Sequence, residues 1–195
     1  MYYLRHVALG LSASIALGVV VLAETEWKTV TLRGEKGLTI SIPTVARDYD
    51  RVKGRDDLMF LSLTVPGDGS LTCFASRDEY PKNSSQAAFA AALATERREI
   101  FCGMNGTSIS QLEIGGSKSF TQNGMQAAIC TASYTDSAEK LPGRVRSQMV
   151  IAAPKKVYFL TCTVEDEDQD TAQYEWSSFW GATVTHIQES FHVPQ

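Results

Sequence analysis

The sequence predicts an α+β fold, and three observations support this. Several segments alternate apolar and polar residues, most clearly residues 38–43, and this period of two is typical of half-buried strands. An alanine-rich segment near residues 83–102 has helical spacing. In the terminal segment, large apolar residues recur every three or four positions, which also predicts a helix. The 195 residues are enough for a sizeable core, and we expect residues 24–195 to form a single domain.

Three or four strands are expected before the first helix. The segments with strand composition are residues 27–32, 38–43, 58–65 and 71–76. The last two predict a hairpin, because Pro66, Gly67, Asp68 and Gly69 between them are all turn formers. A charged stretch, residues 47–57, is expected to be an exposed loop.

The first helix is predicted from a capping-box pattern, in which Gln86 follows Asn83 by three residues. The helix would run to Cys102 and end at Gly103. Its apolar side would consist of Phe89, Leu93 and Ile100. Four further strands are expected after it, at residues 108–120, 125–134, 144–151 and 157–164.

The strand at residues 144–151 alternates sharply between polar and apolar residues. The polar positions are Arg144, Arg146 and Gln148, and the apolar positions between and beyond them are Val145, Met149 and Ile151. This pattern predicts one face exposed to solvent, and the three polar residues are a candidate binding surface.

The terminal helix carries the strongest periodic signal. Its stripe consists of Trp176, Trp180, Val184, Ile187 and Phe191, with Phe179 and Thr183 beside it. A membrane-surface helix would carry lysine or arginine on its polar face, and this segment has neither. We therefore expect the stripe to pack in the core.

The first residues have the features of an export signal. Arg5 precedes an uncharged apolar run, residues 7–22, and Ala23 ends a sequence that signal peptidase reads, so residues 1–23 are expected to be removed. A retained membrane anchor is the alternative, but its apolar core of about 16 residues is shorter than the roughly 20 of a spanning helix. The domain would then be periplasmic or secreted, where its four cysteines can oxidise. A net charge of −4 argues against nucleic-acid partners and gives no reason to expect adsorption to anionic membranes.

The order of these elements resembles the PsbP-like fold. The features that carry the resemblance are the Ile-Ser-Ile-Pro strand ending at Pro43, a hairpin, an alanine-rich helix, a meander and a last helix ending at Phe191. The resemblance implies an antiparallel sheet of about six to seven strands sandwiched by two main helices. Members of this fold include a photosystem extrinsic subunit, a Ran-binding factor of nuclear import and bacterial envelope proteins. The fold has no common catalytic site, so the resemblance implies a binding or accessory role.

Four cysteines allow three pairings into two disulfides. If the last three strands form a meander, Cys130 and Cys162 lie on strands two apart, at a spacing of about 9.6 Å, and a bridge between them is disfavoured. The resemblance implies that the Cys73 strand lies beside the Cys162 strand, which leaves Cys102 to reach Cys130. A Cys73–Cys102 pair stays open, because the helix folds back along the strand before it.

No catalytic or cofactor motif is recognised in the sequence, and we expect no cofactor. His186 and His192 are six residues apart, which does not suit a paired metal site, and they are interpreted as surface residues of the helix. The candidates for a metal site are the acidic residues Asp166, Asp168 and Asp170. As a calcium loop this cluster lacks the glycine and the glutamate, whose positions are taken by Thr171 and Ser177. Acids that precede a helix favour its N-terminus, and Asp170 with Gln173 is the expected capping pair.

We therefore expect an exported, non-enzymatic binding or accessory protein of the cell envelope that contacts another envelope protein. The expected contact surfaces are Arg144, Arg146 and Gln148, and the charged loop at residues 47–57. The alternative is a secreted hydrolase that uses carboxylate or calcium-assisted chemistry at residues 165–170.

Overall fold

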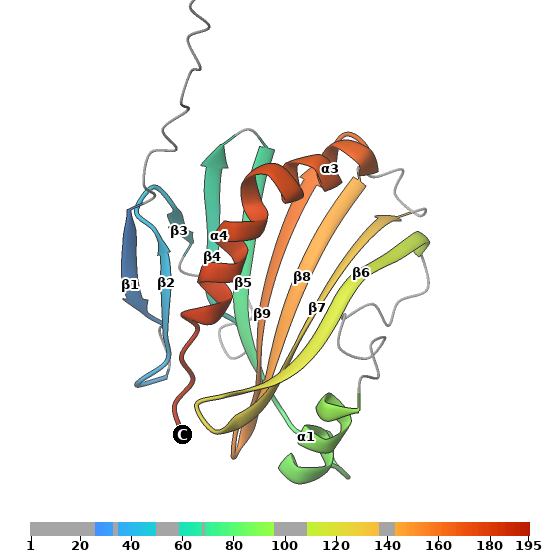
Figure 1. The fold of residues 1–195 in the computed structure, drawn as a ribbon. Coiled ribbons are helices and arrows are strands. Elements are labelled where there is room, and N and C mark those ends of the chain that lie inside the picture. The colour runs from blue at the N-terminus through green and yellow to red at the C-terminus, as the bar shows by residue number, and fades with distance from the viewer. Residues whose placement is uncertain (1–25, 33–34, 50–58, 68, 96–108, 137–142) are drawn as a thin grey trace, which may run out of the picture.

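The computed structural model describes residues 26–32, 35–49, 59–67, 69–95, 109–136 and 143–195 (Figure 1). The expected export signal lies outside these ranges. The strands are β1 (Trp27–Thr31), β2 (Thr39–Pro43), β3 (Arg47–Tyr49), β4 (Met59–Gly67), β5 (Gly69–Glu79), β6 (Ile109–Gln122), β7 (Met125–Asp136), β8 (Gly143–Ala152) and β9 (Lys156–Asp166). The helical elements are α1 (Gln86–Ala94), α3 (Gln169–Glu175), the π-helical turn η1 (Trp176–Trp180) and α4 (Gly181–Glu189). No helix in these ranges is long and apolar enough to span a membrane.

The strands form two antiparallel sheets, so the predicted α+β class is confirmed. The larger sheet has the order β3-β4-β5-β9-β8-β7-β6, and the hairpin, the meander and the β5–β9 pairing all lie in it. β1 and β2 pair only with each other in a two-stranded sheet. This corrects the expectation of one sheet: alternation predicts that a segment is a strand, but it does not identify the strand's neighbours.

Alternation along β8 divides the core into two layers. Met149 and Ile151 pack with Ile187 of α4 in the main cluster. Val150, on the opposite face, packs with Leu93 of α1 in a smaller cluster. The terminal helical segment and α1 therefore lie on opposite faces of the large sheet, and α1 lies near one end of it (Figure 1).

The terminal helical segment buries most of the predicted stripe. Trp180, Val184, Ile187 and Phe191 are buried, whereas Trp176 is half-buried. The segment is not one regular α-helix, because the Gly181 N–H donates to the Trp176 carbonyl, five residues back, in a π turn. Phe179, predicted to broaden the stripe, is 49% exposed.

Two helix starts differ from the prediction. The N-cap of α1 is Ser85, whose hydroxyl accepts from the Ala88 N–H, and it replaces the expected Asn83. The N-cap of α3 is Asp168, which replaces the expected Asp170. Serine and aspartate are both strong capping residues, so the local sequence offered several candidates. α1 ends at Ala94, and the rest of the predicted helix, from residue 96, lies outside the described residues.

The small sheet is attached to the C-terminal end of the chain. Thr39 exchanges backbone hydrogen bonds with His192, at 2.8 and 3.0 Å. The Ser41 N–H donates to the Ser190 hydroxyl at 2.9 Å. These bonds fix β2 beside the end of α4, and its apolar residues Ile40 and Ile42 join the main core.

Gly143 begins β8 and is buried. A Cβ atom at this position would overlap the backbone of Asp168 and Gln169. The absence of a side chain at Gly143 therefore lets the first turn of α3 lie directly on the end of β8.

A cavity between the terminal helix and the sheet

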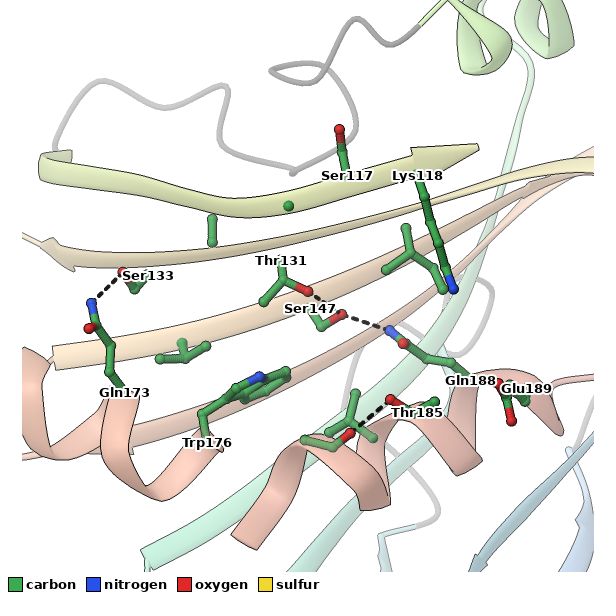
Figure 2. Close-up of a pocket in the computed structure, with 16 residues that line it drawn as sticks. Ser117, Lys118, Thr131, Ser133, Ser147, Gln173, Trp176, Thr185, Gln188 and Glu189 are labelled. Carbon is green, nitrogen blue, oxygen red and sulfur yellow. Dashed lines mark hydrogen bonds between the residues drawn. The ribbon is translucent and has the colours of Figure 1, made fainter. Parts of the chain in front are cut away.

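A cavity of about 800 Å³ lies between the terminal helical segment and strands β6, β7 and β8. Figure 2 shows its side chains, with Thr131, Ser133 and Ser147 on the sheet and Gln173, Trp176 and Gln188 on the helical segment. A volume of this size is within the range of small-molecule binding sites.

The cavity exists because small hydroxyl residues occupy positions that face the core. Thr131 and Ser133 of β7 and Ser147 of β8 lie on the same face as Met149, on which the helical segment packs. Farther along that face of β8, Met149 and Ile151 fill the space against α4. Side chains as short as serine cannot reach the helix, so a volume is left between the two layers.

A network of neutral hydrogen bonds crosses the cavity. The Ser147 hydroxyl, which is buried, accepts from the Gln188 amide at 2.9 Å and from the Thr131 hydroxyl at 3.1 Å. The Ser133 hydroxyl accepts from the amides of Gln173 at 2.8 Å and Gln169 at 3.1 Å. Two serines thus connect the sheet to the helical segment at two points.

The apolar part of the lining comes from both layers. Val145 and Ile129 contribute from the sheet, and Trp176 and Val184 from the helical segment. The π turn positions Trp176, because it inserts one residue between the indole and the regular α4 helix. Gly181 also lines the cavity, and a Cβ there would lie 3.2 Å from the Trp176 carbonyl oxygen.

Charge is confined to one part of the lining. Among the described residues that line the cavity, only Lys118 and Glu189 are ionisable, and both are exposed. The Lys118 ammonium lies 5.7 Å from the centre of the Phe120 ring. The remaining lining is neutral, so the site offers apolar contact and amide and hydroxyl groups.

The predicted binding surface lies on the other face of the sheet and is less exposed than expected. Gln148 is buried, and its amide oxygen accepts from the Thr161 hydroxyl at 3.4 Å. Arg144 is half-buried and pairs with Glu165 at 2.9 Å, and Arg146 is also half-buried. The expectation of one solvent face on β8 is therefore wrong for Gln148, because its polar group is satisfied within the sheet.

The predicted charged loop at residues 47–57 lies mostly outside the described residues. Its first three residues form the edge strand β3, which pairs with β4.

The acidic residues have a structural role at the start of α3. Asp168 accepts from the Thr171 N–H at 2.8 Å and from the Thr171 hydroxyl at 2.9 Å. These bonds lower the pKa of Asp168, the backbone bond contributing most. Asp166 accepts from the N–H of Glu167, and Asp170 lies in the first turn of α3. In the part of the chain that the structure describes, no three histidine, cysteine or acidic residues are grouped to hold a metal ion.

Both predicted surface histidines are exposed, and both have partners. The His186 ring stacks on Trp27 of β1, with 3.7 Å between ring centroids. His192 Nδ1 lies 2.9 Å from the Asn123 amide nitrogen. These contacts attach the terminal segment to β1 and to the β6–β7 turn.

Cys73 and Cys162 lie directly opposite each other on β5 and β9 and form a disulfide. This is the pairing that the resemblance implies. Cys130 lies on β7, and β8 separates it from Cys162, as the meander predicts. Its expected partner Cys102 lies outside the described residues, so that bridge stays a prediction.

Comparisons with known proteins show the fold. No sequence family and no curated protein matches this chain. Cyanobacterial PsbP (CyanoP) from Synechocystis sp. PCC 6803 is similar in structure, with a TM-score of 0.53 and 15% identity, over 94% of this chain and 99% of that chain. LpqN of Mycobacterium tuberculosis, involved in cell envelope biogenesis, has a TM-score of 0.53 and 14% identity, over 88% and 92%. The Saccharomyces cerevisiae Ran-binding protein Mog1p has a TM-score of 0.57 and 13% identity, over 87% and 96%. The protein is thus an antiparallel α+β protein with a cavity between its terminal helical segment and its large sheet. Its fold is PsbP-like, which confirms the resemblance seen in the sequence.

Proposed function

We propose that the protein is an exported, non-enzymatic binding protein of the cell envelope, and that its ligand occupies the cavity between the terminal helical segment and β6–β8. The observation that carries this proposal is the composition of the cavity. Apolar walls around Trp176 and Val184 suit an apolar body, and the serine and glutamine groups suit neutral hydrogen-bonding groups. The ligand class is therefore an uncharged or weakly polar molecule with a substantial apolar part.

Three observations support export and an envelope setting. The first 23 residues have the pattern of a secretion signal. The Cys73–Cys162 disulfide is typical of proteins that fold in an oxidising compartment. One protein of the same fold, LpqN, is involved in cell envelope biogenesis. We extend the proposal to contact with another envelope protein, which would receive or deliver the ligand.

No specific observation favours the hydrolase alternative. The carboxylates of Asp166 and Asp168 accept hydrogen bonds from their own turn, and the ionisable residues of the cavity are at its exposed part. The acidic cluster therefore caps a helix in this structure.

Filling the cavity tests the proposal. Thr131→Phe would place a ring in the space that Thr131 lines, whereas Thr121→Phe adds the same ring at an exposed position of β6. We expect the neutral apolar dye N-phenyl-1-naphthylamine to bind the wild type and Thr121→Phe, with fluorescence enhancement and Trp176-dependent energy transfer. Thr131→Phe should bind at least about tenfold more weakly, a loss of about 1.4 kcal/mol.

Displacement identifies the ligand class. A neutral long-chain alcohol should compete with the dye in the wild type. Equal dye binding by all three proteins, or no binding by any folded protein, would exclude the cavity as the site.

A further inference from the structure

A second cavity, of about 440 Å³, lies away from the first, between the β1–β2 turn, β5, the β8–β9 turn and the C-terminal residues. In Figure 1 the C-terminus lies at the lower end of the molecule, opposite α3. The charged residues of this cleft are Glu35, Lys36, Arg77, Lys155 and Lys156, and Tyr158 lies among them. We call this set the basic cleft.

Glu35 holds two of the cations in place. Its carboxylate accepts from Arg77 at 2.5 Å and lies 3.5 Å from the Lys156 ammonium. It also bonds to the Tyr158 hydroxyl. The side chains of Glu35 and Arg77 are only 19% and 23% exposed, so their positions are fixed by packing as well as by charge. Arg77 and Lys156 are therefore preorganised at the cleft.

Among the side chains that line the cleft, one carboxylate, that of Glu35, does not balance four cations. Lys36 and Lys155 are exposed at the cleft, and no described carboxylate lies within ion-pair distance of either. If the ion-pair network served only to join the two sheets, Glu35, Arg77 and Lys156 would be sufficient. The additional lysines concentrate positive charge in a chain whose net charge is −4.

We propose that the basic cleft binds a phosphate group. A cleft with an excess of positive charge favours a multiply charged anion over a single carboxylate. Lysine ammonium groups bind phosphate as point charges, and the Arg77 fork is already engaged by Glu35. The phosphate can belong to a soluble phosphate compound or to a lipid headgroup, and the two sources share this chemistry.

The test uses pyrophosphate as the soluble probe, with calorimetry on the wild type and two single variants of equal net charge. Lys155→Gln removes a lysine of the cleft, and Lys82→Gln removes an exposed lysine elsewhere. Lys155→Gln should weaken pyrophosphate binding about fivefold, whereas Lys82→Gln should bind pyrophosphate like the wild type. Added salt should weaken pyrophosphate binding by the wild type and both variants, since the lysines are exposed.

Glu35→Gln should change pyrophosphate affinity in the direction opposite to Lys155→Gln. Removing the one carboxylate side chain among the described residues of the cleft should tighten pyrophosphate binding at temperatures where the variant is folded, whereas a purely structural network predicts no tighter binding. A parallel arm measures co-sedimentation with phosphatidylcholine vesicles with and without phosphatidic acid. Binding only to vesicles with phosphatidic acid, and lost in Lys155→Gln, identifies a lipid headgroup. No binding of either probe, or equal binding by Lys155→Gln and Lys82→Gln, would overturn the proposal.

Discussion

Ser147 shows how a single residue defines the candidate site. It occupies a core-facing position of β8 where the next such positions along the strand hold Met149 and Ile151. Its hydroxyl binds Gln188 and Thr131, so the polar group is satisfied while the volume beyond it is left open. The hydroxyl residues at core-facing positions were the available sequence signal, but serine and threonine are ordinary strand residues and form no motif.

The exposure of individual polar residues on β8 was predicted only in part, for a physical reason. The charge of Arg144 and the amide of Gln148 indicate a solvent face, yet Gln148 is buried, and its amide oxygen accepts a hydrogen bond from Thr161 on the neighbouring strand. A sequence shows that a residue is polar, but it does not show whether a partner is available across the sheet.

The pH dependence of stability is predicted from Glu35. Burial raises the pKa of Glu35, but hydrogen bonds from Tyr158 and Arg77 and the charges of Lys156 and Arg77 outweigh it and lower the pKa below 4.5. A lowered pKa in the folded state stabilises the fold above the unfolded pKa, and this contribution disappears as the pH falls through the folded pKa. Glu35→Gln should therefore cost about 0.5–1 kcal/mol at neutral pH and nothing below the folded pKa.

Urea unfolding of both proteins from pH 7 down to pH 3 measures this difference. Glu79→Gln, which changes an exposed carboxylate of β5, is the control and should track the wild type. A stability difference between wild type and Glu35→Gln that is independent of pH would contradict the ion-pair network.

At the scale of the element, the spacing of apolar residues predicted the terminal helical segment and its buried side, but it did not predict the π turn within it. Spacing of three and four residues identified the buried side, including Trp180 and Ile187. The spacing of apolar residues did not predict the π turn, because whether an N–H bonds five residues back depends on what the turn packs against. The sequence spacing predicts the same environment for Trp176 and Trp180. In the structure their environments differ, since Trp180 packs in the core and Trp176 lines the cavity.

The two tryptophans should therefore respond differently to truncation. Trp180→Ala empties a buried aromatic site and should lower the free energy of unfolding by about 3–5 kcal/mol. Trp176→Ala should cost about 1–2 kcal/mol, because only part of its area is removed from water, and it should also abolish dye binding in the cavity. Phe179→Ala, 49% exposed on the same turn, is the control and should change stability by about 0.5 kcal/mol or less.

Chemical unfolding followed by circular dichroism, together with the dye titration, makes this comparison. Equal losses of stability in Trp176→Ala and Trp180→Ala, with dye binding retained, would contradict the division of roles.

At the scale of the whole molecule, the order of elements and the resemblance together predicted more than either alone. Element order gave a hairpin, a helix, a meander and a final helix, and the resemblance placed β5 beside β9. The separate β1–β2 sheet was not predicted, because its position depends on long-range contacts of Thr39 and Ser41 with the end of the chain. Contacts between residues about 150 positions apart in sequence leave no local pattern.

The covalent framework is the last prediction and concerns the whole sheet. Cys73 and Cys162 are separated by 89 residues and join adjacent strands at the centre of the large sheet. Removing this bridge in Cys73→Ala/Cys162→Ala should lower the free energy of unfolding by about 2–5 kcal/mol, since the unfolded chain gains the freedom of a long loop. We also expect a second bridge between Cys102 and Cys130, as the resemblance implies, because these are the two cysteines that the Cys73–Cys162 bridge leaves. Peptide mapping of the unreduced protein should therefore yield one peptide containing Cys73 and Cys162 and another containing Cys102 and Cys130, and a Cys73–Cys102 peptide would contradict both assignments.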